Sequence, residues 1–332
     1  MLVARTFLVS AGLTVVSAAV AACSGATSGG SGPSAMQASA DIASALCNRI
    51  DACAPIYIQS AYRDLASCIS RETPLFAQAL SAPGTGWTPA AIESCAKAFP
   101  GTSCDDVLAH SSPSACKPPA GQLATGAACG DDGQCASGYC NLGAGGKCGS
   151  CAAAAGAAGA TCYRDGDCVD GTVCVGVALS LSPPTAGKCT ALGTSGAKCD
   201  ASTPCAKSLA CSDASSGTCG AVVAGGASCS QTVDIFGTCG AISGSYCGAK
   251  TNGTCTKLGF AAAAQPCGLI GGALTTCEGS GVCQITAGTS MGTCVAPAAD
   301  FGNCDAKNGP GCLAPAVCIG GACVVATPDS CK

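Results

Sequence analysis

The sequence predicts a set of small disulfide-rich repeats, each a short β-hairpin module, preceded by a small disulfide-stapled α-helical domain. The chain holds 33 cysteines in 332 residues, whereas only 4% of its residues are aromatic and 10% are charged. Its apolar fraction of 48% is mostly alanine and cysteine, which supply less buried area than leucine or phenylalanine would. Such a thin core needs covalent cross-links, and these form in an oxidising, exported compartment.

The start of the chain has the pattern of a bacterial lipoprotein signal. Residues 1–22 combine a positive charge with an uncharged apolar run too short for a comfortable membrane span, followed by small residues. The segment ends in VAAC, which resembles the lipobox, so the resemblance implies that Cys23 becomes a lipidated N-terminus. Ser24 follows in place of aspartate, which in the Gram-negative pattern implies an outer membrane lipoprotein. Residues 23–35 are then the anchor and a flexible Gly/Ser tether.

Residues 36–118 are expected to form a helical domain. Apolar residues recur every four positions from Ile42 to Ile50, which predicts a helix over residues 34–53. Residues 60–70 predict a second helix and residues 103–110 a short fourth. Thr88, an N-cap residue followed by proline, predicts the start of a third.

Six cysteines of this region are expected to staple the helices together. They are Cys47, Cys53, Cys68, Cys95, Cys104 and Cys116. We expect Cys53 to pair with Cys68, closing the first helical hairpin, and Cys104 to pair with Cys116.

Residues 119–332 are expected to hold six modules of four cysteines each, an internal repeat with a period of 30 to 38 residues. The first three quartets are Cys129, Cys135, Cys140, Cys148; Cys162, Cys168, Cys174, Cys189; and Cys199, Cys205, Cys211, Cys219. The last three are Cys229, Cys239, Cys247, Cys255; Cys267, Cys277, Cys283, Cys294; and Cys304, Cys312, Cys318, Cys323. Cys151 and Cys331 are left over, to pair with each other or within neighbouring groups.

Glycine and cysteine spacing predicts how each module folds. Four modules carry a glycine three residues before their first cysteine, which predicts a sharp turn at Gly126, Gly159, Gly196 and Gly226. Ser-Gly and Asp-Gly dipeptides between the second and third cysteines predict a β-hairpin in the middle of the module. Pairing of first with third and second with fourth cysteine is favoured, although four cysteines permit three connectivities. Each bridge contributes roughly 3 kcal/mol by closing a loop of about 12 residues.

The spacing of the repeat is similar to that of a known class of secreted module. The run of GxxC, cysteine, cysteine and a variable gap before the last cysteine resembles the Dickkopf N-terminal cysteine-rich domain and related EB-type modules. Bacterial cysteine-rich lipoproteins have a similar layout. The resemblance covers residues 126 to about 325 and is best in the first three quartets. It implies a small disulfide fold and no particular ligand.

Four features of the sequence have the residue types of a chemical or modification site. His110, the only histidine, stands alone at a helix end, an ordinary position for a surface residue. The CGSC segment from Cys148 to Cys151 has redox spacing, but a Gly/Ala-rich stretch follows it where a thioredoxin fold would begin a helix. The acidic run from Asp165 to Asp170 departs from the calcium-loop pattern at several positions. The sequon at Asn252 carries little weight in a bacterium.

Metal binding by the cysteines is a further alternative. Zinc sites favour CxxC pairs, whereas most of these intervals are five to eight residues with turns between. The net charge of -4 gives no footprint for nucleic acid. We therefore expect no enzymatic activity and no cofactor. The expectation is a non-enzymatic lipoprotein that contacts the membrane through its anchor and displays a rigid array for a surface protein or glycan ligand, or for a structural role. Metal binding and CGSC redox chemistry are the alternatives.

Overall fold

The computed structural model describes residues 32–109, 111–179, 181, 183–213, 217–230, 237–248, 253–305, 308–325, 327–328 and 331. The expected signal peptide, Cys23, most of the tether, His110 and Asn252 lie outside this part of the chain. Residues 33–332 form one compact unit. Within the described residues, no helix combines the length and the hydropathy that crossing a membrane requires.

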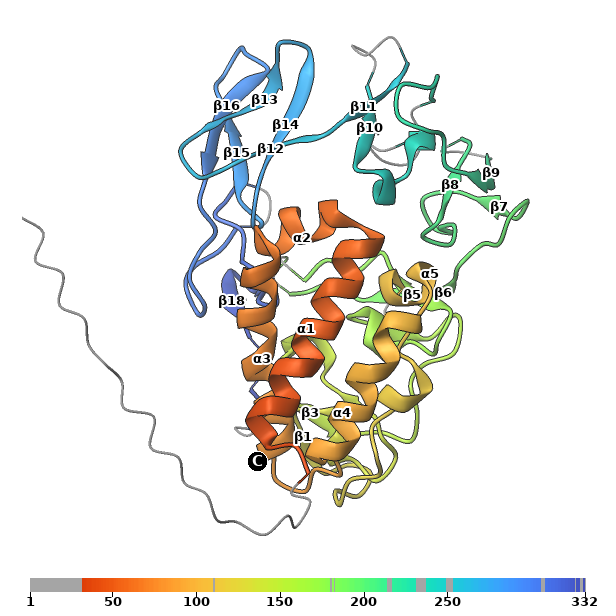
Figure 1. Cartoon of the computed structure of the whole chain (residues 1–332), viewed down its shortest axis with the longest axis vertical. Coiled ribbons are helices and arrows are strands. Elements are labelled where there is room, and N and C mark those ends of the chain that lie inside the picture. The colour runs from red at the N-terminus through yellow and green to blue at the C-terminus, as the bar shows by residue number, and fades with distance from the viewer. Residues whose placement is uncertain are drawn as a thin grey trace, which may run out of the picture. The chain divides into compact units, whose positions relative to one another are not determined.

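The N-terminal part of the unit is helical, as the sequence predicts. Its helices are α1 (Ala35–Cys53), α2 (Pro55–Tyr62), α3 (Leu65–Ser81), α4 (Pro89–Ala98) and α5 (Cys104–Leu108), with short 3₁₀ turns η1 (Phe99–Gly101) and η2 (Ser114–Cys116). Figure 1 shows α1, α3 and α4 running alongside one another, and α1 packs on both of the others. Their apolar faces make a core that includes Ile42, Ile58 and Ile92.

Local sequence explains where these helices begin. Ser34, Asp64, Thr88 and Ser103 are N-caps, and each side chain accepts a hydrogen bond from a backbone N–H in the first turn. The predicted helix over residues 60–70 is wrong in its bounds. Arg63, with φ at 83°, ends α2, and Asp64 then caps α3, which continues past Pro74 to Ser81.

The disulfides of the helical segment differ from both expected pairs. Cys47 bonds to Cys68, Cys53 to Cys104 and Cys95 to Cys116. The predicted pairs of Cys53 with Cys68 and of Cys104 with Cys116 are therefore wrong. Cys47, and not Cys53, is the cysteine of α1 that lies against α3, so the three bridges tie α1 to α3, α1 to α5 and α4 to η2.

The first three modules are small three-stranded antiparallel sheets. Their strand orders are β1-β3-β2, β4-β6-β5 and β7-β9-β8, so the strand at the fourth cysteine lies in the middle. The strands are β1 (Ala128–Cys129), β2 (Cys140–Asn141), β3 (Gly149–Cys151), β4 (Thr161–Cys162), β5 (Thr172–Val175), β6 (Gly187–Ala191), β7 (Lys198–Cys199), β8 (Leu209–Cys211) and β9 (Gly217–Ala221). Short 3₁₀ turns lie in the first two modules, at η3 (Asp132–Gln134), η4 (Gly143–Gly145) and η5 (Asp165–Asp167).

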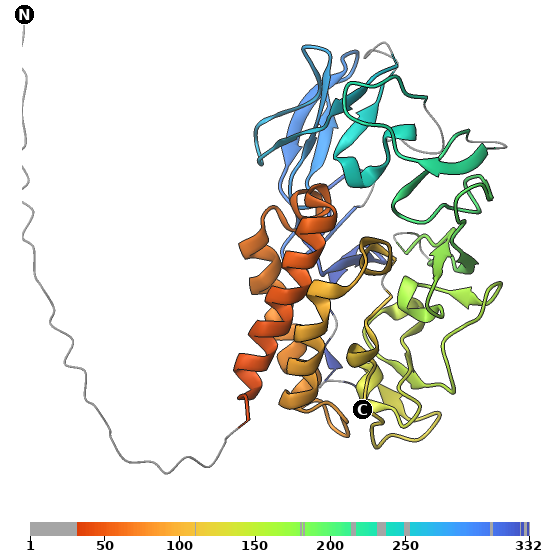
Figure 2. The ribbon, with the colours of Figure 1, turned by 45° about the vertical axis from the view of Figure 1, so that its right-hand side comes forward.

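The last three modules vary this plan. The fourth has the pair β10 (Ser245–Cys247) and β11 (Cys255–Lys257), with η6 (Gly237–Cys239) and η7 (Ala241–Ser243). The fifth is a five-stranded sheet of order β12-β14-β13-β16-β15, in which β12 pairs in parallel with β14. Its strands are β12 (Gly259–Ala261), β13 (Pro266–Ile270), β14 (Ala273–Cys277), β15 (Val282–Ile285) and β16 (Met291–Val295). The sixth pairs β17 (Val317–Ile319) with β18 (Ala322–Val324). Figure 2 shows the strands of the fourth and fifth modules, coloured cyan to blue, apart from the orange helices.

The hairpin of each module lies later in the chain than the sequence suggested. In the first module, Gly138 between the second and third cysteines has φ at 72° and makes a turn. The antiparallel ladder, however, joins the strands of the third and fourth cysteines, as in β2 with β3 and β5 with β6. The short segment between the second and third cysteines is held by bridges instead of by its own ladder.

One hydrogen-bond pattern recurs in all six modules. The residue three positions before the first cysteine donates its N–H to the carbonyl of the last cysteine at 2.8 Å. The N–H of that last cysteine donates in return to the carbonyl of the residue that follows the first donor, as from Cys151 to Ala127. The donors are Gly126, Gly159, Gly196, Gly226, Ala264 and Phe301, all with φ between 64° and 88°. The predicted sharp turn at the four glycines is confirmed, and two modules achieve the same turn without glycine.

Candidate functional site

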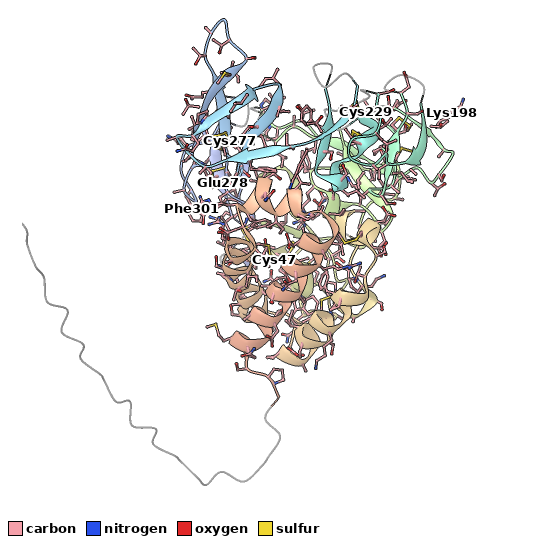
Figure 3. The ribbon with its side chains drawn as sticks, turned by 45° about the horizontal axis from the view of Figure 1, so that its top comes forward. Cys47, Lys198, Cys229, Cys277, Glu278 and Phe301 are labelled. Atoms are coloured by element: carbon pink, nitrogen blue, oxygen red, sulfur yellow. A yellow bond between two sulfur atoms is a disulfide. The ribbon has the colours of Figure 1, made fainter. Side chains whose placement is uncertain are left out.

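Sixteen disulfides join all the cysteines from Cys47 to Cys331. In modules two to six the first cysteine bonds to the third and the second to the fourth, the connectivity that we favoured. Figure 3 shows Cys47 among the helices and Cys229 and Cys277 in separate modules. The sulfurs of these bridges are mostly buried and form the centre of each module.

The first module corrects the predicted quartet. Cys135 bonds to Cys151, whereas Cys148 bonds to Cys331 across 183 residues. Cys151, and not Cys148, accepts the hydrogen bond from Gly126 at 2.8 Å, so Cys151 is the fourth cysteine of the repeat. The spacing could not choose between them because both stand close to the end of the module.

The bond between Cys148 and Cys331, here called the clasp, joins the first module to the C-terminal tail. Cys148 is exposed and Cys331 is buried. Lys147 places its ammonium 5.8 Å from the centre of the Phe301 ring in module six, a cation–π contact beside the clasp. The CGSC segment thus contains no bond between its own two cysteines, which is the bond that a thioredoxin-type couple uses.

Sulfur atoms gather in threes within the modules, as in Cys129, Cys135 and Cys151, whose sulfurs lie within 4.8 Å of one another. Such groups have the spacing that a metal ion needs. Each of these sulfurs is nevertheless in a disulfide, and metal ligation by cysteine requires a thiolate. In this oxidised state the groups are the crossed bridges of the module.

The acidic turns between first and second cysteines brace their own modules. Asp165 accepts a hydrogen bond from the Cys174 N–H at 2.7 Å, and Asp167 accepts from the Tyr163 N–H at 2.8 Å. Asp167 also contacts the Arg164 guanidinium at 3.0 Å and is almost completely buried. These carboxylates therefore stabilise the fold of their own module.

The first module uses the same two positions. Asp132 accepts from the Cys140 N–H at 2.8 Å, and Gln134 accepts from the Gly130 N–H at 2.7 Å. The Gly-Asp-Asp-Gly turn at residues 130–133 is therefore not an exposed contact loop: its two glycines are buried and its two aspartates half-buried. Burial raises the pKa of Asp132 to about 6, although the Cys140 N–H and the Arg164 charge act in the opposite direction.

All six modules contact the helical segment. Modules one, two and three do so through Gly133 with Gly86, Lys117 with Asp170, and Asp105 with Ser208. In module four Tyr246 packs on Ile56, and the linker residue Leu258 joins this cluster. The N–H of Gly279 in module five donates to the Gln59 carbonyl, and that of Ala314 in module six donates to the Ala61 carbonyl. Arg71 of α3 holds module six as well, through Ala314 and Asp300 at 2.5 Å each.

A cavity of about 1150 Å³ lies between the helices and the modules that contact them. Its helical wall includes Leu46, Tyr57, Phe76 and Trp87, and its module wall includes Leu274, Ile285 and Val317. The volume is somewhat larger than the range typical of small-molecule sites, roughly 300 to 1000 Å³. No sequence signal predicted this cavity, because its walls come from segments far apart in the chain.

Acidic groups on the cavity wall are shielded from water. Glu72 is buried and accepts a hydrogen bond from the Tyr62 hydroxyl at 2.6 Å. Burial raises the pKa of Glu72, and burial together with the Glu72 charge raises the pKa of Tyr62. Asp131 also has a raised pKa, again chiefly because of burial, and its carboxylate accepts from the Gly133 N–H at 2.8 Å.

The fold and the site define a disulfide-rich repeat protein with short antiparallel hairpins and a small helical N-terminal region. Comparison with protein-family models, with curated proteins and with solved structures gives no significant match to this chain.

Proposed function

We propose that the protein is an exported, non-enzymatic lipoprotein of the bacterial cell envelope, anchored in the outer membrane by a lipid on Cys23. Its disulfide-stapled modules form a rigid scaffold exposed at the cell surface, in a binding or structural role towards a surface protein or glycan. The observation that carries the proposal is the pairing of every cysteine from Cys47 to Cys331. Thirty-two paired cysteines are typical of an oxidising compartment, which supports export from the cytoplasm.

The N-terminal sequence supports the anchored form of this proposal. The apolar run before Cys23 is an export signal in composition, and the lipobox resemblance supplies the acylation site. Buried acyl chains contribute about 0.8 kcal/mol for each CH₂, so multiple acylation retains a protein durably at a bilayer. The similarity of the modules to Dickkopf-type and EB-type domains belongs to the same proposal and adds no ligand to it.

The two alternative functions require bonds to break first. A metal site would need reduction of both bridges of a module, and CGSC redox chemistry would need loss of the bonds from Cys135 to Cys151 and from Cys148 to Cys331. Metal analysis of the oxidised protein and thiol counting would reveal either function. We propose neither, because the bridges are the centre of each module's fold.

The anchor is tested with Cys23→Ala expressed in a Gram-negative host. We expect the parent protein to sediment with outer membranes and to be cut by protease added to intact cells, and the variant to appear in the soluble fraction. Ser24→Ala is the matched control and should behave like the parent, whereas Ser24→Asp should move the protein to the inner membrane. Equal sedimentation of Cys23→Ala and the parent would refute the lipid anchor. Resistance of the parent to protease on intact cells would refute surface exposure.

A further inference from the structure

The cavity between helices and modules concentrates the aromatic residues of a chain that has few. The sequence contains one tryptophan, five tyrosines and six phenylalanines. The cavity wall takes the tryptophan, two of the tyrosines and two of the phenylalanines: Trp87, Tyr57, Tyr62, Phe76 and Phe99. Aromatic side chains bury more area than any others, so a chain this poor in them would be expected to use them to fill its core. Tyr62 and Phe99 do belong to the buried core of the helical segment, and Phe76 and Trp87 pack against it, but all five side chains also line the cavity.

Several large apolar side chains on this wall remain uncovered. Ile285 exposes 50% of its surface, Val317 46% and Tyr57 39%. Burial in the surrounding protein nevertheless raises the pKa of Tyr57. Both facts hold together if the accessible part of Tyr57 faces the cavity and not open solvent. Covering these side chains with an apolar ligand would gain about 25 cal/mol for each Å² removed from water.

The charges on the wall select among apolar ligands. Of the described lining residues, Glu72, Asp131 and Asp165 are acidic and Lys207 is the one base. Arg71, adjacent to Glu72, directs its guanidinium to Asp300 and to carbonyls of module six. An anionic ligand would therefore meet an excess of carboxyl groups. Ser60, Ser111 and Thr276 supply hydroxyl groups that can pair with an uncharged polar head.

We propose that this cavity binds a neutral amphiphile of lipid size, with an acyl or similarly apolar body and an uncharged head of hydroxyl, ester or amide groups. The apolar body packs on the aromatic and aliphatic wall, and the head pairs with the hydroxyl and carboxyl groups. This site does not depend on the lipid anchor at Cys23. It adds a single small amphiphilic molecule as a ligand to a scaffold whose proposed partners are macromolecules.

Trp87 makes the proposal directly measurable. It is the only tryptophan of the chain, it lines the cavity, and its indole lies against Gly133, where no side chain would fit. Bromine quenches tryptophan fluorescence at short range. The probes are the glycerol monoester of 9,10-dibromostearic acid and the free dibrominated acid, which share an acyl chain and differ in head charge. Both are titrated below their aggregation concentrations into the full mature protein at pH 8, with thiol counting to show intact disulfides.

We expect saturable quenching by the monoester and at least tenfold weaker binding of the free acid. Val317→Glu, which puts a carboxylate on the cavity wall, should weaken monoester binding at least tenfold. Val169→Glu is the matched control, because Val169 is 39% exposed and lies outside the cavity wall; its affinity should stay within twofold of the parent. Ile285→Glu is a second cavity variant and should behave like Val317→Glu.

Three results would overturn the proposal. The first is monoester quenching that is absent or does not saturate. The second is equal affinity for the acid and the ester, which would mean that the wall does not select head charge. The third is equal loss of binding in Val317→Glu and Val169→Glu while both retain parental circular dichroism, which would place the ligand elsewhere.

Discussion

A left-handed residue three positions before the first cysteine is the smallest unit that all six modules share. Its N–H reaches the carbonyl of the last cysteine only because φ is positive, and glycine adopts that conformation without strain. Modules five and six place Ala264 and Phe301 there, where an L-residue costs roughly 1 to 2 kcal/mol. The repeat therefore tolerates the strain where the bridges hold the turn closed.

Gly196→Ala tests that cost in isolation. Gly196 has φ at +81°, and a Cβ built there has no atom within 4 Å, so only backbone strain changes. We expect the free energy of unfolding to fall by about 1 kcal/mol, measured by denaturant with disulfides intact. Gly220→Ala in the same module is the control, since its Cβ also meets open space and its φ is not in the left-handed range. Equal effects of the two substitutions would contradict the role of the turn.

Asp132 gives a pH dependence of the opposite kind to most carboxylates. Its folded pKa is raised from 3.8 to about 6 by burial, so the folded state favours the protonated form. The contribution of protonated Asp132 to the free energy of unfolding is fully present below about pH 4 and is lost as the pH rises through about 6. Asp132→Asn keeps the acceptor for the Cys140 N–H without the charge. We expect it to stabilise the protein by about 1 to 2 kcal/mol at pH 7.5 and to have little effect at pH 4.

Asp200→Asn supplies the comparison for that measurement. Hydrogen bonds from Ser202 and Thr203 hold the pKa of Asp200 at about 2, so its contribution is present above about pH 4 and is lost as the pH falls through 2. This variant should not gain stability at pH 7.5. Thermal unfolding of both variants between pH 4 and 7.5 checks the signs. A gain for Asp132→Asn that is the same at every pH would contradict the buried charge.

At the scale of elements, local signals predicted most of what is local. Thr88 followed by proline marked the start of α4, and in four of the six modules the glycine before the first cysteine marked the module turn. The apolar pattern did not predict the break between α2 and α3. The break depends on the left-handed backbone of Arg63, and an arginine side chain does not indicate a left-handed conformation. The hairpin was misplaced because Ser-Gly and Asp-Gly make turns equally well without a ladder around them.

Pairings between distant segments were the part that sequence could not supply. Spacing alone does not distinguish Cys148 from Cys151 as the last cysteine of the first module; the Gly126 hydrogen bond does. Likewise, Cys47 and Cys53 are both in α1, and only helix packing decides which one meets α3. The cavity depends on contacts such as Arg71 with Ala314, which leave no trace in local composition.

At the scale of the whole molecule, the clasp converts a linear series of modules into a closed one. The modules each contact the helical segment, and the bond from Cys148 to Cys331 joins the first to the C-terminal tail. Weak single contacts along a chain would allow the modules to separate one at a time. The clasp opposes such separation, because a module can then leave the helices only if the closed series of modules is stretched or the clasp is broken.

The double substitution Cys148→Ser and Cys331→Ser removes the clasp and measures how much closure contributes to the free energy of unfolding. Loop entropy gives an upper limit of about 5 kcal/mol for a loop this long, and the bridges inside the loop shorten it. We therefore expect a loss of about 2 to 4 kcal/mol in the free energy of unfolding. Hydrogen exchange should rise in residues 142–151 and 317–325 and stay at the parental rate in strands β7 to β9, because no bridge of the third module has changed.

The matched comparison is Cys199→Ser with Cys211→Ser, which removes a bridge of similar chemistry inside one module. It should raise exchange in the third module and leave the segments beside the clasp protected. If the clasp acts by closure, its loss should also weaken the binding of a neutral amphiphile, since Val317 of the cavity wall belongs to the module that the tail follows. Uniform exchange across all modules in the clasp variant would show instead that the modules unfold as one unit, and unchanged exchange would show that the helical contacts alone hold the circuit together.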